Sequence, residues 1–309
     1  MLARVQLEPI TLPGGWSGSA LTRCQGVAPS FEGEVTLPPA SQWAALLEPV
    51  TTRASSLPGY ELLKYSRSGE VFRVRLCWDG GSIDAVCKQS RSEGAIGALL
   101  DRVRVSGARR QFNLGLRLLR AGIGTALPLA QFDQSAAPRA SWLITRFLAN
   151  VVDLDQVALT LLPKLDAHRT RLVKNNIIDS VVHLLAQLYE HGLYHRDLKA
   201  TNILLSDWDA PDREPRTWLV DLEGLRPFGL LRRRRVWRPL VRLAASLLSY
   251  DAVTRTDYFR FLRAYLARTE RMHRASGPLY LKLGRWATDY VRESRKRKTH
   301  KLDGYVDGH

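Results

Sequence analysis

The spacing of hydrophobic residues changes about half-way along this chain, from a period of two to a helical period. Between residues 60 and 147, short segments alternate apolar with basic or polar side chains, as residues 71–76 do. This alternation predicts half-buried β-strands, and one helix that ends at Gly122 interrupts them. The predicted strands cover residues 71–76, 83–88, 127–132 and 141–147, and the helix covers residues 108–121.

Helical spacing dominates the second half. In residues 171–190, Ile177, Val181 and Leu188 fall on one helical face, and Gly192 is placed to end the helix. Further helices are predicted over residues 240–248, 257–267 and 279–291, and a short strand over residues 218–220. Strands followed by helices indicate an α+β fold. We expect a small antiparallel β-sheet N-lobe with one helix, and a larger, mainly helical C-lobe.

Changes in this pattern divide the chain. Residues 1–55 are rich in Pro, Gly and Ser and only weakly periodic, so we expect an irregular N-terminal extension with at most a short hairpin. The N-lobe then covers residues 56–147 and the C-lobe residues 148–291. Residues 292–309 form a basic C-terminal tail.

The chain carries an excess of positive charge, because 46 Lys and Arg residues outnumber 30 Asp and Glu residues and give a net charge of +16. Such a surface suits an anionic partner: a phosphorylated substrate, an acidic lipid or nucleic acid. The three cysteines form no C-x-x-C pair, which argues against a zinc site or a disulfide framework. The sequence shows neither a signal-peptide core nor an apolar run long enough to span a bilayer, so we expect a cytoplasmic protein, soluble or bound at a membrane surface.

The strongest chemical signal is the stretch YHRDLKATNILL, residues 194–205. Its H-R-D-L-K-x-x-N spacing is that of the catalytic loop of protein-kinase-like enzymes. Asp197 would accept the proton of a substrate hydroxyl, Lys199 would neutralise charge at the transferring phosphate, and Asn202 would ligate magnesium. The alternative is a charged turn that Asp197 caps, but chance would then have to supply the six specified letters and the apolar run that follows them.

A second acidic motif follows at a suitable distance. Asp221 ends the predicted strand 218–220, stands 24 residues after Asp197, and is followed three positions later by Gly224. This D-L-E-G sequence matches the D-F-G position of kinases, where the Asp binds the magnesium that bridges the phosphates. Alone, the sequence would indicate an ordinary turn; its order and spacing favour a metal ligand.

Nucleotide contacts are expected from the strand-rich half. Lys88 ends the predicted strand 83–88, where it can reach the α- and β-phosphates, while Val86 on the same face packs on the adenine. Taken alone, a lysine at a strand end is usually a solvated charge. A helix glutamate should pair with it, but Gln111 occupies that position and supplies an acceptor without a charge; Glu93 is the other candidate. The turn at residues 65–71 has one glycine in place of G-x-G-x-x-G, so an ordinary hairpin is an equal alternative.

Together these stretches resemble the lipopolysaccharide kinase family, bacterial protein-kinase-like enzymes that phosphorylate heptose or Kdo sugars of the lipopolysaccharide inner core. The matching segments are ARRQFNLGLRLLRAGIGTALPLA (108–130), SWLITRFLANVVDL (141–154), HGLYHRDLKATNILL (191–205), WLVDLEGLR (218–226) and TDYFRFLRAYL (256–266). The resemblance implies a two-lobed protein-kinase-like fold, ATP and Mg²⁺ as cofactors, and a sugar hydroxyl of an anionic glycolipid, the lipopolysaccharide core, as acceptor.

The resemblance also implies roles for nucleotide-binding residues. Lys88 corresponds to the nucleotide lysine, and the backbone at Arg146 and Phe147 corresponds to the adenine-binding hinge. Leu204, in the apolar run after the catalytic loop, is expected among the nucleotide contacts. The family commonly has Glu at the position of Gln111, which bears on the catalytic rate rather than on the fold. In the C-lobe, the same resemblance implies a catalytic base and two magnesium ligands at the positions assigned above.

Four consecutive arginines, Arg232, Arg233, Arg234 and Arg235, follow the second motif. They predict a peripheral contact with acidic lipid on the cytoplasmic face of the inner membrane, because each cation near an acidic leaflet contributes about 1 kcal/mol. A solvated helix start is the alternative. We expect no nucleic-acid partner, since the sequence contains no recognised binding module.

Three other functions compete with a sugar kinase. A Ser/Thr protein kinase is opposed by the missing A-P-E motif and the short segment after Gly224. A pseudokinase, which would bind ATP as an inert scaffold at the membrane, is favoured by Gln111 and opposed by intact Asp197, Asn202 and Asp221. A basic adaptor would bind its anionic partner without nucleotide and with strong salt dependence.

Overall fold

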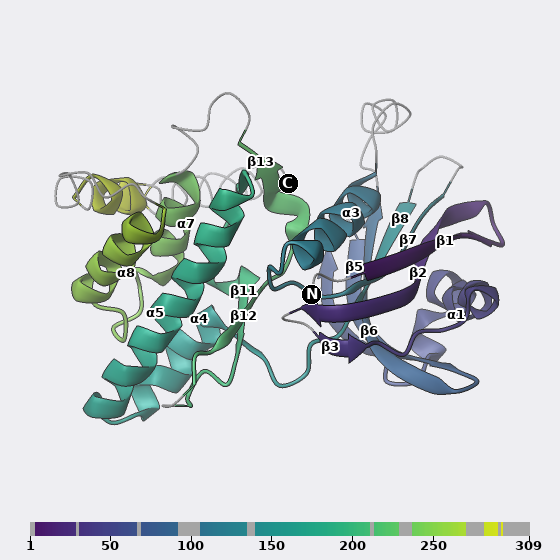
Figure 1. Cartoon of the computed structure of the whole chain (residues 1–309), viewed down its shortest axis with the longest axis horizontal. Helices are drawn as coiled ribbons and strands as arrows, with labels where there is room; N and C mark the ends of the chain where they lie inside the picture. Colours follow the sequence, from purple (N-terminus) through teal and green to yellow (C-terminus); the bar gives the residue numbers. More distant parts are fainter. Residues whose placement is uncertain are drawn as a thin grey trace, which may run out of the picture. The chain divides into compact units, whose positions relative to one another are not determined.

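A computed structural model describes residues 4–28, 31–66, 69–91, 106–134, 140–210, 213–228, 237–269, 281–289 and 292. The chain divides into two compact units, Met1–Ala149 and Asn150–His309. Unit 1 is rich in strands, and unit 2 contains the longest helix (Figure 1).

Unit 1 is built on one antiparallel sheet in the order β1-β2-β7-β8-β6-β5-β4, with β3 paired to β2. Its strands are β1 (Arg4–Leu12), β2 (Trp16–Ala28), β3 (Phe31–Glu34), β4 (Glu61–Ser66), β5 (Gly69–Trp78), β6 (Gly81–Arg91), β7 (Pro128–Gln134) and β8 (Ala140–Arg146). The predicted alternation is confirmed in β5, where Phe72, Val74 and Leu76 are buried between more exposed neighbours. On the other face, Arg73 and Arg75 both pair with Asp84 at 2.8 Å.

In the described part of unit 1, this sheet is covered by helices α1 (Ala40–Thr52) and α3 (Gly107–Arg120), with a 3-10 turn η1 (Ala54–Ser56) after α1. Helix α3 packs against β7 and β8, and α1 packs against β1, β2 and β5 (Figure 1). The predicted helix 108–121 is thus confirmed, and the Ser106 side chain caps its first turn by accepting from Arg109 N at 3.0 Å. One core of buried side chains joins helices and sheet, including Trp43, Phe72, Phe112 and Trp142.

The prediction of an irregular extension over residues 1–55 is wrong, because this segment contributes strands β1, β2 and β3 and helix α1. Strand β2 pairs with β7 from Trp16↔Gln134 to Ala20↔Ala130, and α1 buries Trp43 and Leu47. Strand β2 and helix α1 were missed because the local spacing of apolar residues does not reveal what forms them. In β2, position 18 requires glycine because a Cβ there would lie 1.9 Å from the Gln131 carbonyl oxygen of the paired strand. Helix α1 has no side-chain cap at its first turn and contains a proline, so it lacks ordinary helix signals.

Unit 2 is mainly helical, as predicted. Its helices are α4 (Leu154–Gln156), α5 (Ala167–Glu190), α7 (Trp237–Leu247) and α8 (Arg255–Arg268), with helical residues also at 281–289 and shorter turns η2 (Val157–Leu161), η3 (Leu162–Lys164), η4 (Ala200–Asn202) and η5 (Leu222–Gly224). The strands of unit 2 that the structure describes form two small antiparallel sheets, β12 (Arg216–Leu219) with β11 (Ile203–Ser206) and β9 (Val152–Asp153), and β10 (Leu193–His195) with β13 (Leu225–Pro227).

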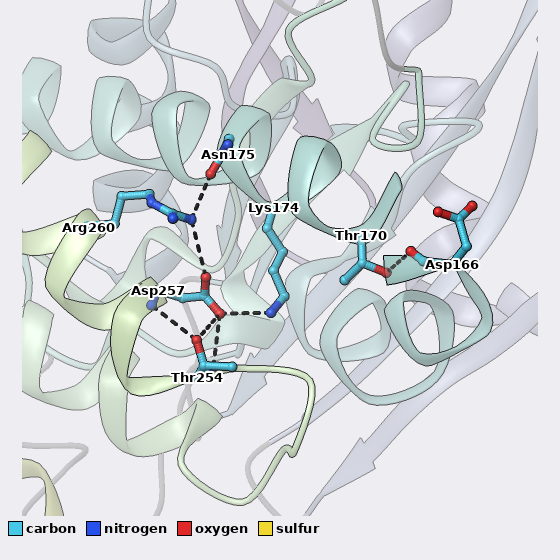
Figure 2. A network of polar contacts seen from close by, with 7 residues as sticks. All are labelled: Asp166, Thr170, Lys174, Asn175, Thr254, Asp257 and Arg260. Carbon is cyan, nitrogen blue, oxygen red and sulfur yellow. Dashed lines mark hydrogen bonds and ion pairs between the residues drawn. The ribbon is translucent and has the colours of Figure 1, made fainter. Parts of the chain in front are cut away.

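A buried ion pair connects α5 to α8. Lys174 Nζ donates to Asp257 Oδ2 at 2.8 Å, and the same carboxylate caps α8 by accepting from Thr254 N and Thr254 Oγ1 (Figure 2). Arg260 lies 3.6 Å from the other carboxylate oxygen and also donates to Asn175. Among the residues that the structure describes, no helix is both long and apolar enough to cross a bilayer.

Candidate active site

The sequence YHRDLKATNILL forms a supported loop in unit 2. It runs from β10 through Asp197 and the 3-10 turn η4 into β11. The Asn202 side chain donates through Nδ2 to the Asp197 carbonyl oxygen at 3.1 Å, and Asn202 N donates to the Lys199 carbonyl oxygen at 3.0 Å. The two residues that the sequence predicted as base and metal ligand are therefore held together by a direct hydrogen bond.

The Asp197 carboxylate faces two cations. Lys199 Nζ lies 3.2 Å from Oδ2, and Arg242 Nη1 from α7 donates to Oδ1. The Asp197 side chain is 42% exposed, so a substrate can reach it. Partial burial tends to raise the pKa of this carboxyl, but the charges and hydrogen bonds of Lys199 and Arg242 outweigh burial and lower it. Asp197 is therefore ionised and able to accept a proton at neutral pH.

Helix α7 contributes two residues that sequence reasoning missed. Besides Arg242, Ser246 one turn later accepts a hydrogen bond through Oγ from Ala200 N at 3.0 Å. Their spacing of four residues was the available signal, because such residues share one face of a helix. Nothing in the local sequence, however, says that this face meets a loop more than 40 positions earlier in the chain.

Asp221 follows β12 and lies beside the catalytic loop. Val220 N donates to the Asn202 carbonyl oxygen at 3.0 Å, which joins the two motifs through the backbone. Asp221 has φ 56° and ψ 57°, the left-handed region that Asp tolerates better than most residues. Left-handed backbone of this kind is frequent at functional sites, where surrounding contacts hold it in place.

His195 and Gly224 fix the backbone of this second motif. His195 is buried and donates through Nε2 to the Asp221 carbonyl oxygen at 3.0 Å. Burial lowers the pKa of His195, although the Asp221 carbonyl opposes the shift, so the ring is neutral. Gly224 lies against this ring, since a Cβ there would be 2.5 Å from His195 Cε1. This close approach explains why the D-L-E-G sequence ends in glycine.

The donor set fits magnesium rather than a metal held by protein alone. Within the described ranges, no group of three or more His, Cys, Asp or Glu side chains is arranged to hold a metal ion. Magnesium, however, commonly binds through one or two carboxylates together with waters and substrate phosphates. Because the Asn202 amide nitrogen donates to Asp197, its oxygen is the atom left for a cation, and Asp221 would supply the carboxylate.

In unit 1 the predicted lysine contact is present. Lys88 Nζ donates to Gln111 Oε1 at 3.5 Å, and Gln111 Nε2 donates to the Gly107 carbonyl oxygen at 3.3 Å. Gln111 is 3% exposed, so it is a buried acceptor fixed on α3. In β6, Val86 and Lys88 are half-buried on one face, while Ala85 is buried on the other. The alternation thus places the proposed adenine and phosphate contacts on the same side of the sheet.

The hinge residues use their N–H groups inside unit 1. Arg146 N donates to the Leu127 carbonyl oxygen and Phe147 N donates to the Asp84 carbonyl oxygen, both at 2.8 Å. The N–H groups of both residues are therefore already paired within unit 1. The Phe147 ring has the Arg73 guanidinium 3.9 Å from its centre.

The other residues predicted to contact the nucleotide lie partly in unit 2 and partly in unit 1. In unit 2, Leu204 is half-buried on β11 between buried Ile203 and Leu205. In the glycine turn of unit 1, Gly69 has φ 147° and a Cβ there would meet the Gln89 carbonyl oxygen at 2.1 Å. The glycine therefore serves close strand packing. The arginine run at 232–235 and the second acidic candidate, at position 93, lie outside the described residues.

A model of the lipopolysaccharide kinase (Kdo/WaaP) family matches residues 98–265, just over half of the chain. The chain belongs to this family. Members of the lipopolysaccharide kinase family are phosphotransferases, in agreement with the motifs above. The matched range contains Asp197, Asn202 and Asp221, whereas Lys88 precedes it.

A solved structure described as WaaP in complex with acyl carrier protein is similar to this chain. The two share 21% sequence identity and a TM-score of 0.55, over 84% of this chain and 98% of the other. At this identity the likeness shows a common fold, which supports the predicted kinase-like architecture. No curated protein matched the chain.

Proposed function

We propose that this lipopolysaccharide kinase family member transfers the γ-phosphoryl group of ATP, with magnesium, to a hydroxyl of a lipopolysaccharide inner-core sugar, heptose or Kdo. The observation that carries the proposal is the geometry around Asp197: an accessible, ionised carboxylate beside Lys199, with Asn202 bound to its backbone. A carboxylate beside a mobile cation suits transfer to an alcohol, in which a proton leaves as negative charge moves onto phosphate oxygens.

Asp197 orients the acceptor hydroxyl and receives its proton. Lys199, whose side chain is 51% exposed, neutralises charge on the transferring group. Asn202 and Asp221 would hold magnesium, which supplies charge neutralisation on the phosphates when bound. Catalysis of this kind rests on positioning and on electrostatic stabilisation, so the hydrogen bonds that fix the loop matter as much as the reacting groups.

The nucleotide contacts follow from unit 1. Lys88 would bind the α- and β-phosphates, Val86 would pack on the adenine, and the chain around Arg146 and Phe147 would form the hinge. Gln111 accepts from Lys88 without a charge. We therefore expect weaker fixation of Lys88 than a glutamate would give, because charge-assisted hydrogen bonds are roughly twice as strong as neutral ones.

The positive net charge of the chain supports an anionic acceptor. A net charge of +16 suits an anionic glycolipid. We propose that Arg232, Arg233, Arg234 and Arg235 contribute a reversible contact with acidic lipid at the cytoplasmic face of the inner membrane, where the acceptor would be met.

The test is ATP turnover by the purified protein with magnesium, with and without deacylated lipopolysaccharide core. Asp197→Asn should lower acceptor-stimulated turnover about 10²- to 10⁴-fold, the usual contribution of a general base, while nucleotide affinity is kept. Asp179→Asn, the same change at an exposed site on α5, is the matched control and should leave turnover unchanged.

Three outcomes would contradict parts of the proposal. Unchanged turnover in Asp197→Asn would remove the catalytic assignment. Phosphate transfer to a panel of proteins but none to the core sugar would point to a protein kinase. Tight ATP binding without turnover on any acceptor would contradict catalysis by this chain.

A further inference from the structure

Helix α7 contacts the catalytic loop at two points. Arg242 Nη1 donates to Asp197 Oδ1, and Ser246 Oγ accepts from Ala200 N. The serine in turn donates to the Leu243 carbonyl oxygen at 2.8 Å, within its own helix. One face of α7 therefore holds both the backbone and the carboxylate of the loop, a role that the proposed function does not assign.

The two cations on Asp197 differ in how firmly they are held. Lys199 is 51% exposed and carries its charge on a flexible stem, so it can follow a phosphate group. Arg242 is 19% exposed, and its planar guanidinium suits fixed hydrogen-bond geometry. The ion pair with Lys199 is thus exchangeable, whereas the one with Arg242 is held in place by its surroundings.

We propose that Arg242 is a positioning residue: it holds Asp197 Oδ1, so that Oδ2 receives the acceptor hydroxyl when Lys199 moves to the transferring phosphate. This inference rests on the proposed function. In that step the acceptor proton moves to Asp197 Oδ2 and a bond forms between the acceptor oxygen and the γ-phosphorus. The bond from that phosphorus to the β,γ-bridging oxygen breaks, and ADP leaves with the electron pair.

The experiment compares Arg242→Gln and Arg242→Lys with Arg238→Gln, the same change at an exposed position one turn earlier on α7. Turnover is measured with magnesium while the concentrations of ATP and of deacylated lipopolysaccharide core are varied. Arg242→Gln should lower kcat by about 10- to 100-fold, the loss expected from a misplaced catalytic group, and leave the KM for ATP unchanged. Arg242→Lys should restore part of kcat, because lysine keeps the positive charge but lacks the planar fork.

The outcomes separate this inference from the proposed function. Asp197-dependent turnover with a wild-type kcat in Arg242→Gln would overturn the inference alone. A loss of kcat together with a raised KM for ATP, a lower thermal midpoint and no rescue by lysine would assign Arg242 a structural role and also overturn it. Turnover that does not depend on Asp197 would instead remove the proposed function.

Discussion

The ion pair between Lys174 and Asp257 should stabilise unit 2 in an asymmetric way. Asp257 has several partners: Lys174 at 2.8 Å, Thr254 N at 2.9 Å, Thr254 Oγ1 at 2.8 Å, and Arg260 at 3.6 Å. Lys174 pairs only with Asp257 in the part of the chain that the structure describes. Removing the carboxylate should therefore leave a buried ammonium alone, whereas removing the ammonium leaves a carboxylate that is still compensated.

The burial of Lys174 and Asp257 determines how much free energy of unfolding each substitution removes. Lys174 is 14% exposed and Asp257 is 11% exposed, so solvent screening does not reduce the pair to the small value of a surface salt bridge. Removal of one partner of a buried pair costs about 3–5 kcal/mol when the remaining charge is uncompensated. We expect that cost for Asp257→Asn, which also weakens the α8 cap. For Lys174→Met we expect about 1.5–3 kcal/mol, the usual loss of one hydrogen bond to a charged group.

Urea denaturation followed by far-UV circular dichroism at neutral pH measures both free energies of unfolding. The variant that carries both substitutions completes a double-mutant cycle. Its loss of unfolding free energy should be smaller than the sum of the two single losses by about 1–3 kcal/mol. Hydrogen exchange of the amides of α5 and α8 locates the loss. Arg171→Met, on the exposed side of α5, is the matched control.

Two results would refute this reasoning. Equal costs for Lys174→Met and Asp257→Asn would mean that the remaining partners of Asp257 do not compensate its charge. Additive costs in the double variant would mean that the two side chains do not interact energetically, despite the 2.8 Å contact between them.

Three further predictions concern side chains already placed. Gln111→Glu should give Lys88 a charged partner and raise ATP affinity several-fold, measured by calorimetry. Gly224→Ala should push its Cβ into the His195 ring, cost about 1–3 kcal/mol of stability in urea unfolding and lower turnover. Burial opposes ionisation of Asp257, but Lys174 and the Thr254 cap lower its pKa. The stabilisation that ionised Asp257 provides is therefore complete above about pH 4 and lost as pH falls further. The difference in free energy of unfolding between the wild type and Asp257→Asn should accordingly disappear in acid.

The elements that could be predicted from the sequence are those with strong local patterns. Strands β5 and β6 and helices α3 and α5 each bury one side. Their apolar periodicity therefore shows directly which side chains are buried. Helix α5 begins slightly earlier than predicted, since the Asp166 side chain caps it by accepting from Arg169 N at 2.9 Å. The contact between Lys88 and Gln111 was also predictable, because the kinase pattern places Gln111 where a helix glutamate would pair with the lysine.

The missed features depend on partners far away in the sequence. Strand β2 contains Ser and Gly residues that resemble a loop, and only its pairing with β7 makes it a strand. Likewise, Arg242 belongs to an amphipathic helix whose pattern reveals a buried face but not what that face contacts. The catalytic loop was therefore predictable as a motif, whereas its support from α7 required the structure.

The position of β2 has a consequence for synthesis of the chain on the ribosome. Ser19 pairs with Gln131, about 110 positions further along, so the sheet of unit 1 cannot close until β7 has emerged. At about 5–20 residues per second, β1 and β2 must wait roughly 6–20 s with their apolar faces open. A fragment started at residue 56 would create the opposite problem, because β7 would become an open edge and a template for aggregation. Trimming the chain to the range matched by the family model would therefore remove strands that the sheet needs.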